Sequence, residues 1–344
     1  MKITPGELYF VGEEDLIDGT LTPLVKIGLV REKEDRTSEE RVREHQTGNP
    51  RRLRVLRVFA SPVVDRVETL LQAEFAPRRI GGEWFHLPGA ELDAAIQVAE
   101  TRVNEATANA PALIAAHELE RTESNGQALT PGTEIIEMHH RLLSVREQLA
   151  VTKKAEDQLE EALIETQHAT PDGPRYVTEQ PRSPSSYFDK AAFESTHPRI
   201  AGRYISEKTR LTQRFTVTPI KDHVPDLTAD NPELGSHLSD VETAIAEGRG
   251  ASVLHGHFLE LLTLRSPLDW EKELLEAQLK ASCQDHEKIA GICKWARTLV
   301  TKPALNVDKL KADRPDLYSR FIQQRPGTTA YIIAKDLGYR LPPG

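Results

Sequence analysis

Residues 7–30 read ELYFVGEEDLIDGTLTPLVKIGLV, and this stretch indicates how the fold begins. Its two ends, residues 7–12 and 24–30, are short apolar runs rich in β-branched and aromatic side chains, which is typical of β-strands. The residues between them include Asp, Gly, Thr and Pro, which favour turns. We therefore expect an antiparallel β-hairpin with a long loop.

A helix, a third strand and a second helix are predicted next. Thr37, with acidic residues in the turn that follows it, marks the beginning of a helix, and the run at residues 48–50 (GNP) marks its end. Residues 53–60 (LRVLRVFA) alternate apolar and basic side chains, as a half-buried strand does. The second helix begins at residues 61–62 (SP) and has one apolar face. That face consists of Val64, Val67, Leu71 and Phe75.

The predicted fold class is α+β. Residues 1–88 form a small domain, a three-stranded antiparallel sheet with flanking helices. Residues 89–168 form an acidic helical connector, residues 169–186 form a linker rich in Pro and Ser, and residues 187–344 form a mainly helical C-terminal domain. A chain of 344 residues is long enough for two domains.

The connector ends in an approximate heptad pattern over residues 133–168. Its apolar positions are Ile135, Met138, Leu142, Val145, Leu149, Leu159 and Leu163. The pattern fits a coiled-coil seam that makes a homodimer, and it fits equally a helix packed within one chain.

Composition excludes several classes of protein. No apolar run is long enough to span a bilayer, and the first ten residues (MKITPGELYF) lack the apolar core of a signal peptide, so we expect a cytoplasmic protein. The two cysteines, Cys283 and Cys293, exclude a disulfide scaffold and are interpreted as buried thiols.

The net charge of −9 is unevenly distributed. Residues 89–168 contain six Lys and Arg and fifteen Asp and Glu, which accounts for the whole acidic excess. Residues 36–57 contain seven Arg and three Glu, and residues 190–221 contain seven basic and two acidic residues interleaved with aromatics. The net charge therefore does not exclude a nucleic-acid partner, although a half-buried sheet would give the second pattern as well.

Chemically informative residues recur along residues 1–88. They are Tyr9, the run Lys26-Ile27-Gly28, Arg41 and His45 on one face of the first helix, Glu68 on the second helix, and the closing run Gly82-Glu83-Trp84-Phe85. Taken one at a time, Tyr9 fits a core aromatic, and Arg41, His45 and Glu68 fit solvated helix residues.

Taken in order, these residues resemble the GIY-YIG nuclease superfamily. Tyr9 matches the tyrosine of the first motif, and Lys-Ile-Gly stands where the superfamily has Tyr-Ile-Gly. Arg41 through His45 matches its Arg-x-x-x-His helix, and Glu68 matches its later glutamate. The runs RVREHQTGNP and GGEWFHL are similar to one branch, the T5orf172/Mug113-like domains, over about residues 5–88.

The resemblance implies a divalent-metal-dependent endonuclease that hydrolyses DNA phosphodiester bonds, as in phage defence or restriction. It implies that Glu68 binds Mg²⁺ or Mn²⁺ and that Arg41 contacts the phosphoryl oxygens. Tyr9, Lys26 and His45 are all candidates to accept a proton from water. The analogy favours Tyr9 as the base, with Lys26 orienting the water or the phosphate.

DNA binding is expected at arginines beside these residues, and one rival interpretation stays open. The expected contacts to backbone phosphates come from Arg36, Arg43, Arg51, Arg52 and Arg54. Because Lys26 replaces a tyrosine and the first motif is incomplete, a catalytically decayed module that binds DNA or acts as a scaffold is the alternative.

Overall fold

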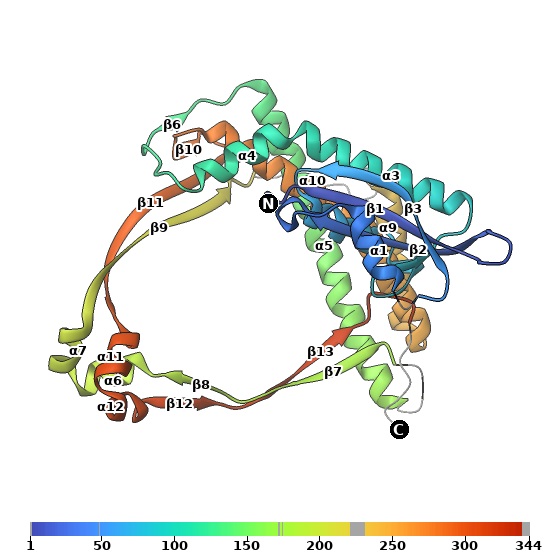
Figure 1. The fold of residues 1–344 in the computed structure, drawn as a ribbon. Helices are drawn as coiled ribbons and strands as arrows, with labels where there is room; N and C mark the ends of the chain where they lie inside the picture. Colours follow the sequence, from blue (N-terminus) through green and yellow to red (C-terminus); the bar gives the residue numbers. More distant parts are fainter. Residues whose placement is uncertain (1, 48, 171–172, 174, 221–230, 339–344) are drawn as a thin grey trace.

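The computed structural model describes residues 2–47, 49–170, 173, 175–220 and 231–338 (Figure 1). Of the features predicted above, Gly48, parts of the linker (residues 171, 172 and 174) and Lys221 lie outside these residues. The N-terminal sheet has the strand order β3-β1-β2-β5-β4, and its pairs are antiparallel. Its strands are β1 (Gly6–Glu14), β2 (Leu21–Arg31), β3 (Arg52–Ser61), β4 (Arg79–Gly81) and β5 (Trp84–His86).

The sheet corrects the prediction of three strands. The run at residues 79–86 adds a small hairpin to the outer edge of β2, with Leu24 opposite His86 and Lys26 opposite Trp84. Gly82 reverses the chain between β4 and β5 with φ +58, a conformation that favours glycine. Strands of three residues are too short to show a periodicity in the sequence.

Two helices follow the predicted starts closely. In α1 (Ser38–Gln46), the Thr37 side chain accepts a hydrogen bond from the Glu40 amide, and the Glu40 carboxylate accepts one from the Thr37 amide. This reciprocal capping box fixes the helix N-terminus. The second helix, α2 (Val64–Glu74), begins just after the predicted start at residues 61–62, because Ser61 ends β3. It buries Val64, Val67 and Leu71 as expected, and Phe75 follows as the C-cap residue. Short 3₁₀ turns lie at Glu32–Glu34 (η1) and Ala76–Arg78 (η2).

The two faces of β1 enter different clusters. Leu8 and Phe10 join the main core, which α2 and α3 (Ala90–Ala108) cover. Tyr9 and Val11 lie on the other face and pack with Val42 of α1. The sheet is therefore covered on both sides, and the candidate residues approach it from α1 and α2.

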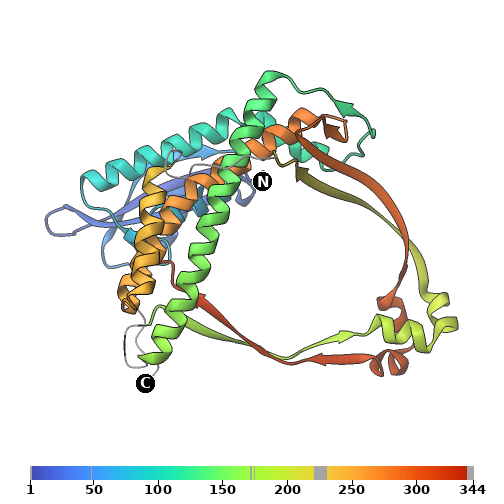
Figure 2. The ribbon, with the colours of Figure 1, turned by 180° about the vertical axis from the view of Figure 1, so that it is seen from behind.

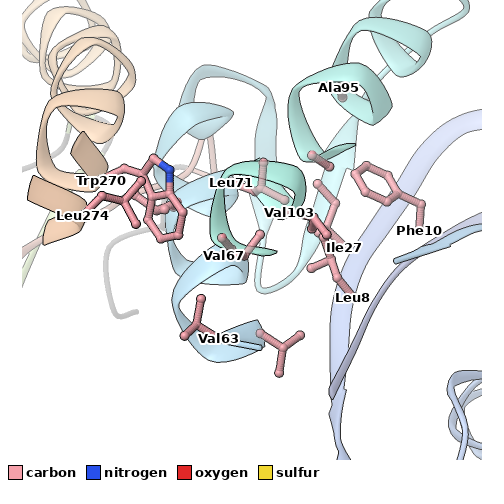
Figure 3. Packing of buried hydrophobic residues seen from close by; sticks show 14 of the residues in the cluster. Leu8, Phe10, Ile27, Val63, Val67, Leu71, Ala95, Val103, Trp270 and Leu274 are labelled. Carbon is pink, nitrogen blue, oxygen red and sulfur yellow. The ribbon is translucent and has the colours of Figure 1, made fainter. Parts of the chain in front are cut away.

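The expected boundary at residue 88 does not separate two cores. Ala95 and Val103 of α3 share one cluster with Trp270 and Leu274 of the C-terminal helix α10 (Ala251–Cys283). Figure 3 shows Trp270 and Leu274 turned toward Leu71 of α2. Residues 90–108 therefore belong to the N-terminal core rather than to a connector, because their small apolar residues cover the sheet.

Four further helices form the part of the protein that is called the body below. They are α4 (Ala110–Leu119), α5 (Thr133–Ala169) and α9 (Pro232–Ala246), together with α10. The heptad positions Val145, Leu159 and Leu163 of α5 lie in one cluster with Leu254 and Phe258 of α10. The structure thus buries this seam within one chain, the second of the two alternatives considered above.

The C-terminal part is richer in strands than predicted. Part of the expected linker forms β7 (Val177–Arg182) and β8 (Ser185–Phe188), which pair with β13 (Thr328–Ile333) and β12 (Ile322–Arg325). The longest pair joins β9 (Ile205–Val217) to β11 (Cys293–Leu305) in the sheet β6-β10-β11-β9, with β6 at Ala128–Leu129 and β10 at Lys288–Ile289. The pairs β7–β13, β8–β12 and β9–β11 join segments that lie far apart along the chain, so local composition does not reveal them.

These paired strands close a ring with α5 (Figures 1 and 2). The chain leaves along β7 and β8, bends at α6 (Lys190–Thr196) and α7 (Pro198–Tyr204), and returns along β9. It follows the same path in reverse along β11, α11 (Val307–Asp313), α12 (Pro315–Ser319), β12 and β13. The bend has its own apolar cluster, including Phe193 and Leu310.

Two buried histidines of α5 and α10 contact the chain just after β9 and β13. His139 Nε2 of α5 lies 2.7 Å from the carbonyl oxygen of Thr218, just after β9. His255 Nε2 of α10 lies 2.9 Å from the carbonyl oxygen of Ala334, just after β13. Burial lowers the pKa of both imidazoles, so each is a neutral hydrogen-bond donor.

Two smaller expectations can be compared directly with the structure. Cys283 and Cys293 are buried free thiols, as predicted, and their sulfurs lie 3.9 Å apart. Across the described ranges, no helix combines the length and the apolar character that a membrane span requires.

Candidate functional site

Tyr9 is held against Gly28 across two neighbouring strands. The two residues are directly paired in the β1–β2 register, and the Tyr9 side chain is 1% exposed. A Cβ added to Gly28 would lie 2.6 Å from the Tyr9 hydroxyl oxygen and 2.7 Å from Cζ. Glycine is therefore required at position 28 so that the tyrosine ring can lie flat over the strand.

Gly28→Ala is expected to destabilise the protein by about 1–3 kcal/mol, because the ring has no room to withdraw. Gly81→Ala is the matched control, since nothing lies within 4 Å of a Cβ built on Gly81. Urea unfolding of the two variants beside wild type measures the difference. Equal stability of the two variants would contradict the close approach.

Lys26 connects a helix and a strand at the same site. Its Nζ lies 3.2 Å from His45 Nε2 of α1 and 2.9 Å from Glu83 Oε2, just before β5. The ammonium therefore donates to an imidazole and to a carboxylate at once. Glu83 was part of the closing run in the sequence, but nothing in the sequence distinguished it from any other surface glutamate in a turn.

Arg41 approaches the Tyr9 hydroxyl from α1. Burial, and then the negative charge of Glu83, raise the pKa of Tyr9 to about 12, and the charge and hydrogen bond of Arg41 only partly oppose this. Tyr9 is consequently a phenol at neutral pH. Arg41 also donates to Glu44, one turn along α1, at 2.9 Å.

His45 is the site's uncharged basic group. Burial and the neighbouring cations Lys26 and Arg41 lower the pKa of this imidazole, and the charges of Glu83 and Glu44 only partly offset them. At neutral pH its ring is therefore neutral and can accept a proton.

Glu68 is a half-buried carboxyl group on α2. Burial, and then repulsion from Glu83 and Asp65, raise its pKa to about 7, and the cations Arg31 and Arg79 only partly oppose this. Within the described part of the chain no hydrogen bond or ion pair holds the Glu68 carboxylate. Its negative charge is poorly compensated by the protein itself.

The raised pKa of Glu68 predicts a pH-dependent stability difference. The folded protein favours neutral Glu68, so this contribution is complete below about pH 4.5 and is lost as pH rises through about 7. Without divalent cations, wild type should therefore lose up to about 3 kcal/mol relative to Glu68→Gln between pH 5 and pH 8. Denaturant unfolding of both proteins at the two pH values measures this. Parallel stability curves would contradict it.

The residues present suit a divalent cation. A hard cation prefers carboxylate oxygens and commonly retains several waters, so a single protein carboxylate is sufficient for Mg²⁺. A cation at Glu68 would favour the ionised carboxylate against the burial and the repulsion that raise its pKa. Glu83 lies in the same electrostatic neighbourhood but is already paired with Lys26.

The structure brings all five predicted site residues together. Tyr9, Arg41 and Glu68 interact electrostatically, and Lys26 contacts His45 directly. Glu83 interacts with Tyr9, Lys26 and Glu68 and is the additional member of the group.

The predicted DNA-binding arginines are mostly paired with acidic neighbours. Arg36 pairs with Glu34 and Glu44, Arg51 pairs with Glu13, and Arg52 and Arg54 pair with Glu14. Among the described residues Arg43 has no such partner and is exposed. The arginine-rich stretch is therefore a weaker phosphate-binding surface than its composition predicts.

Comparison with known proteins gives one family match. Residues 8–100 match the model of the T5orf172 domain. This range includes all the site residues described above and the first part of α3. No curated protein and no solved structure matches the chain.

Proposed function

We propose that this protein is a divalent-metal-dependent endonuclease whose N-terminal domain is of the GIY-YIG type and hydrolyses DNA phosphodiester bonds. The observation that carries the proposal is the convergence of Glu68, Glu83, Arg41 and the Lys26–His45 pair around Tyr9. The T5orf172 match over the same residues is consistent with a nuclease-like or DNA-binding role.

Each side chain has a separate task in this proposal. Glu68 holds the cation, which when bound stabilises charge on the phosphate and the leaving oxygen. Arg41 presents its guanidinium to the phosphoryl oxygens, since it already lies over the Tyr9 hydroxyl. Lys26 orients the attacking water while Glu83 fixes the position of its ammonium.

The proton from water goes to His45 rather than to Tyr9 in this scheme. A phenol with a pKa of about 12 retains its proton at neutral pH and acts as a hydrogen-bond donor. The lowered pKa of His45 leaves the ring neutral, and its Nε2 can take the proton once the Lys26 ammonium, which donates to it in this structure, turns to the attacking water. The structure thus favours a different base from the one that the family analogy gave.

A plasmid-nicking assay with matched arginine variants tests the proposal. Wild type should nick supercoiled DNA with Mg²⁺ or Mn²⁺ and not in chelator. Arg41→Ala should lower the rate at saturating DNA by about 10²–10³-fold, as loss of one donor to a transition-state oxygen does. Arg121→Ala, at an exposed arginine in the turn after α4, should cut at nearly the wild-type rate. Equal loss in the two variants, or metal-independent cutting, would exclude this site.

The second candidate is a module that binds DNA without cutting it. The full burial of Tyr9 and the engagement of Lys26 by Glu83 favour this reading. It predicts DNA binding that does not change in Glu68→Ala and no nicking with any divalent cation.

A further inference from the structure

The two-stranded ribbon β9–β11 carries its charge on one face. Alternate residues of a strand point to the same side, and directly paired residues of two strands share that side. Lys208, Arg210 and Arg214 of β9 therefore lie on one face, and the register adds Lys302 opposite Lys208 and Lys294 opposite Thr216. This basic face contains no Asp or Glu.

Most of these cations have no counter-charge. Lys294 pairs with Glu287 at 2.7 Å, but among the described residues no carboxylate pairs with Lys208, Arg210, Arg214 or Lys302, and all four are exposed. Lys208 lies directly opposite Lys302, an arrangement of like charges that destabilises a strand pair. The basic face therefore does not stabilise the ribbon, and an external anion would compensate it.

The opposite face of the ribbon anchors it to the body. Phe215 and Trp295 are directly paired on that face and pack in the cluster that includes Leu142 and Leu279. Lys280 of α10 lies over both rings, 5.4 and 5.5 Å from their centroids. Because packing uses this face at the root of the ribbon, the basic face is the one that remains free.

The strands and the bend of the ring are basic although the chain is acidic. Residues 177–217 and 293–333, which form its strands and bend, contain fifteen Lys and Arg and seven Asp and Glu, a net charge of +8. The whole chain has a net charge of −9. The positive charge is thus concentrated on the strands and the bend of the ring.

We propose that the basic face of the β9–β11 ribbon binds duplex DNA. The major groove admits a two-stranded β-ribbon, and the Lys and Arg side chains with the interleaved Thr212 and Thr298 suit contacts to phosphates and base edges. No aromatic residue lies on this face, so it lacks the stacking platform typical of single-strand binding. The inference deepens the proposed function by naming the substrate as double-stranded.

Fluorescence anisotropy with a labelled DNA duplex in chelator tests the inference without any cleavage. The double variant Arg210→Gln/Arg214→Gln should weaken binding at least tenfold and lower the slope of log K against log salt by about two. The control Thr209→Glu/Gln213→Glu changes the net charge by the same two units on the opposite, exposed face of the same strand. It should bind nearly as wild type does.

The outcomes separate this inference from the proposed function. Equal weakening in test and control variants, or tighter binding of the corresponding single strand, would overturn the inference. Ribbon-dependent binding by a protein that never nicks DNA would support DNA binding by the ribbon and exclude the endonuclease activity. A ribbon variant that still nicks DNA and binds it with unchanged affinity would support the endonuclease activity and exclude DNA binding by the ribbon.

A separate cluster on α9 and α10 points to a metal site. One ligand atom each of His237, His257 and Glu260 lies within 4.8 Å of the others. His237 Nε2 lies 3.1 Å from the His257 carbonyl oxygen, which leaves its Nδ1 facing Glu260 Oε2 at 3.4 Å. His257 Nδ1 is buried and has no hydrogen-bond partner within the described ranges.

We infer that these three residues bind Zn²⁺. Two imidazoles and one carboxylate, with a further position open, form a ligand set that zinc adopts in proteins. The His237 Nε2–H bond to a carbonyl is the contact that orients a histidine ligand. His237, Glu260 and Asp240 line a cavity of about 750 Å³, so water or a small anion can reach the ion and complete the coordination.

Zinc content after dialysis of the full chain measures this second inference. Wild type should retain one zinc per chain and rise in thermal midpoint with added Zn²⁺ but not Mg²⁺. His237→Ala and Glu260→Gln should lose both effects, and Glu242→Gln, an exposed glutamate on α9, should keep them. Zinc retention equal in all four proteins would overturn the site.

Discussion

Replacing Glu68 by glutamine is expected to lower DNA cleavage by about 10³-fold or more, because the metal's stabilisation of transition-state charge is worth several kcal/mol. The amide keeps the size of the side chain but cannot supply an anionic ligand. Initial rates of plasmid nicking with saturating Mg²⁺ measure the loss.

Glu68→Gln should also stabilise the protein. The prediction is therefore that one substitution lowers activity and raises stability. Glutamine removes a charge that is disfavoured by burial and by repulsion from Glu83 and Asp65, the effects that raise the pKa of Glu68 to about 7. A variant that is more stable at pH 8 without metal and inactive with it has lost a functional charge rather than its fold. A Glu68→Gln protein that cleaves DNA as fast as wild type would show that Glu68 does not hold an essential cation.

Trp270→Ala is expected to destabilise the protein by about 3–5 kcal/mol, the usual cost of removing a buried aromatic side chain. Trp270 is 1% exposed, and its Nε1 donates to Glu105 of α3 at 2.7 Å. It packs in the core that holds the N-terminal sheet (Figure 3). The substitution therefore affects the N-terminal domain from a residue far along the sequence.

The position of Trp270 also predicts how the protein unfolds. The sheet and the α5–α10 pair should unfold in one transition, because α10 contributes to the cores of both. Leu299→Ala, at a side chain 52% exposed on the ribbon, is the control and should change stability little. Denaturant melts followed by tryptophan fluorescence and far-UV circular dichroism test both points. Two separate transitions would show that the shared core does not couple the parts.

The sequence predicted those helices and strands that a short run of residues specifies by itself. Thr37 predicted a capped helix, and alternation over residues 53–60 predicted β3. It could not predict that β7 pairs with β13, since the partners are separated by some 150 residues and β7 is polar. A polar segment that forms half of a two-stranded ribbon has the composition of a linker.

The candidate site was predictable to the extent that spacing along helices and strands determines neighbours. Arg41 and His45 share a helix face by their spacing, and both reach the site. The role of Glu83 was not predictable, because it depends on β5 pairing with β2 beside Lys26. The pairing of the arginines with Glu13 and Glu14 likewise depends on the β1–β3 register.

The ring has a topological consequence. It consists of two chain loops, one through α5 and β9 and one through α10 and β13, closed at their ends by the contacts of His139 and His255. Because both loops surround the same opening, severing one peptide bond in either leaves the other intact. Opening the ring without cutting the chain therefore requires both loops to separate at their non-covalent closures.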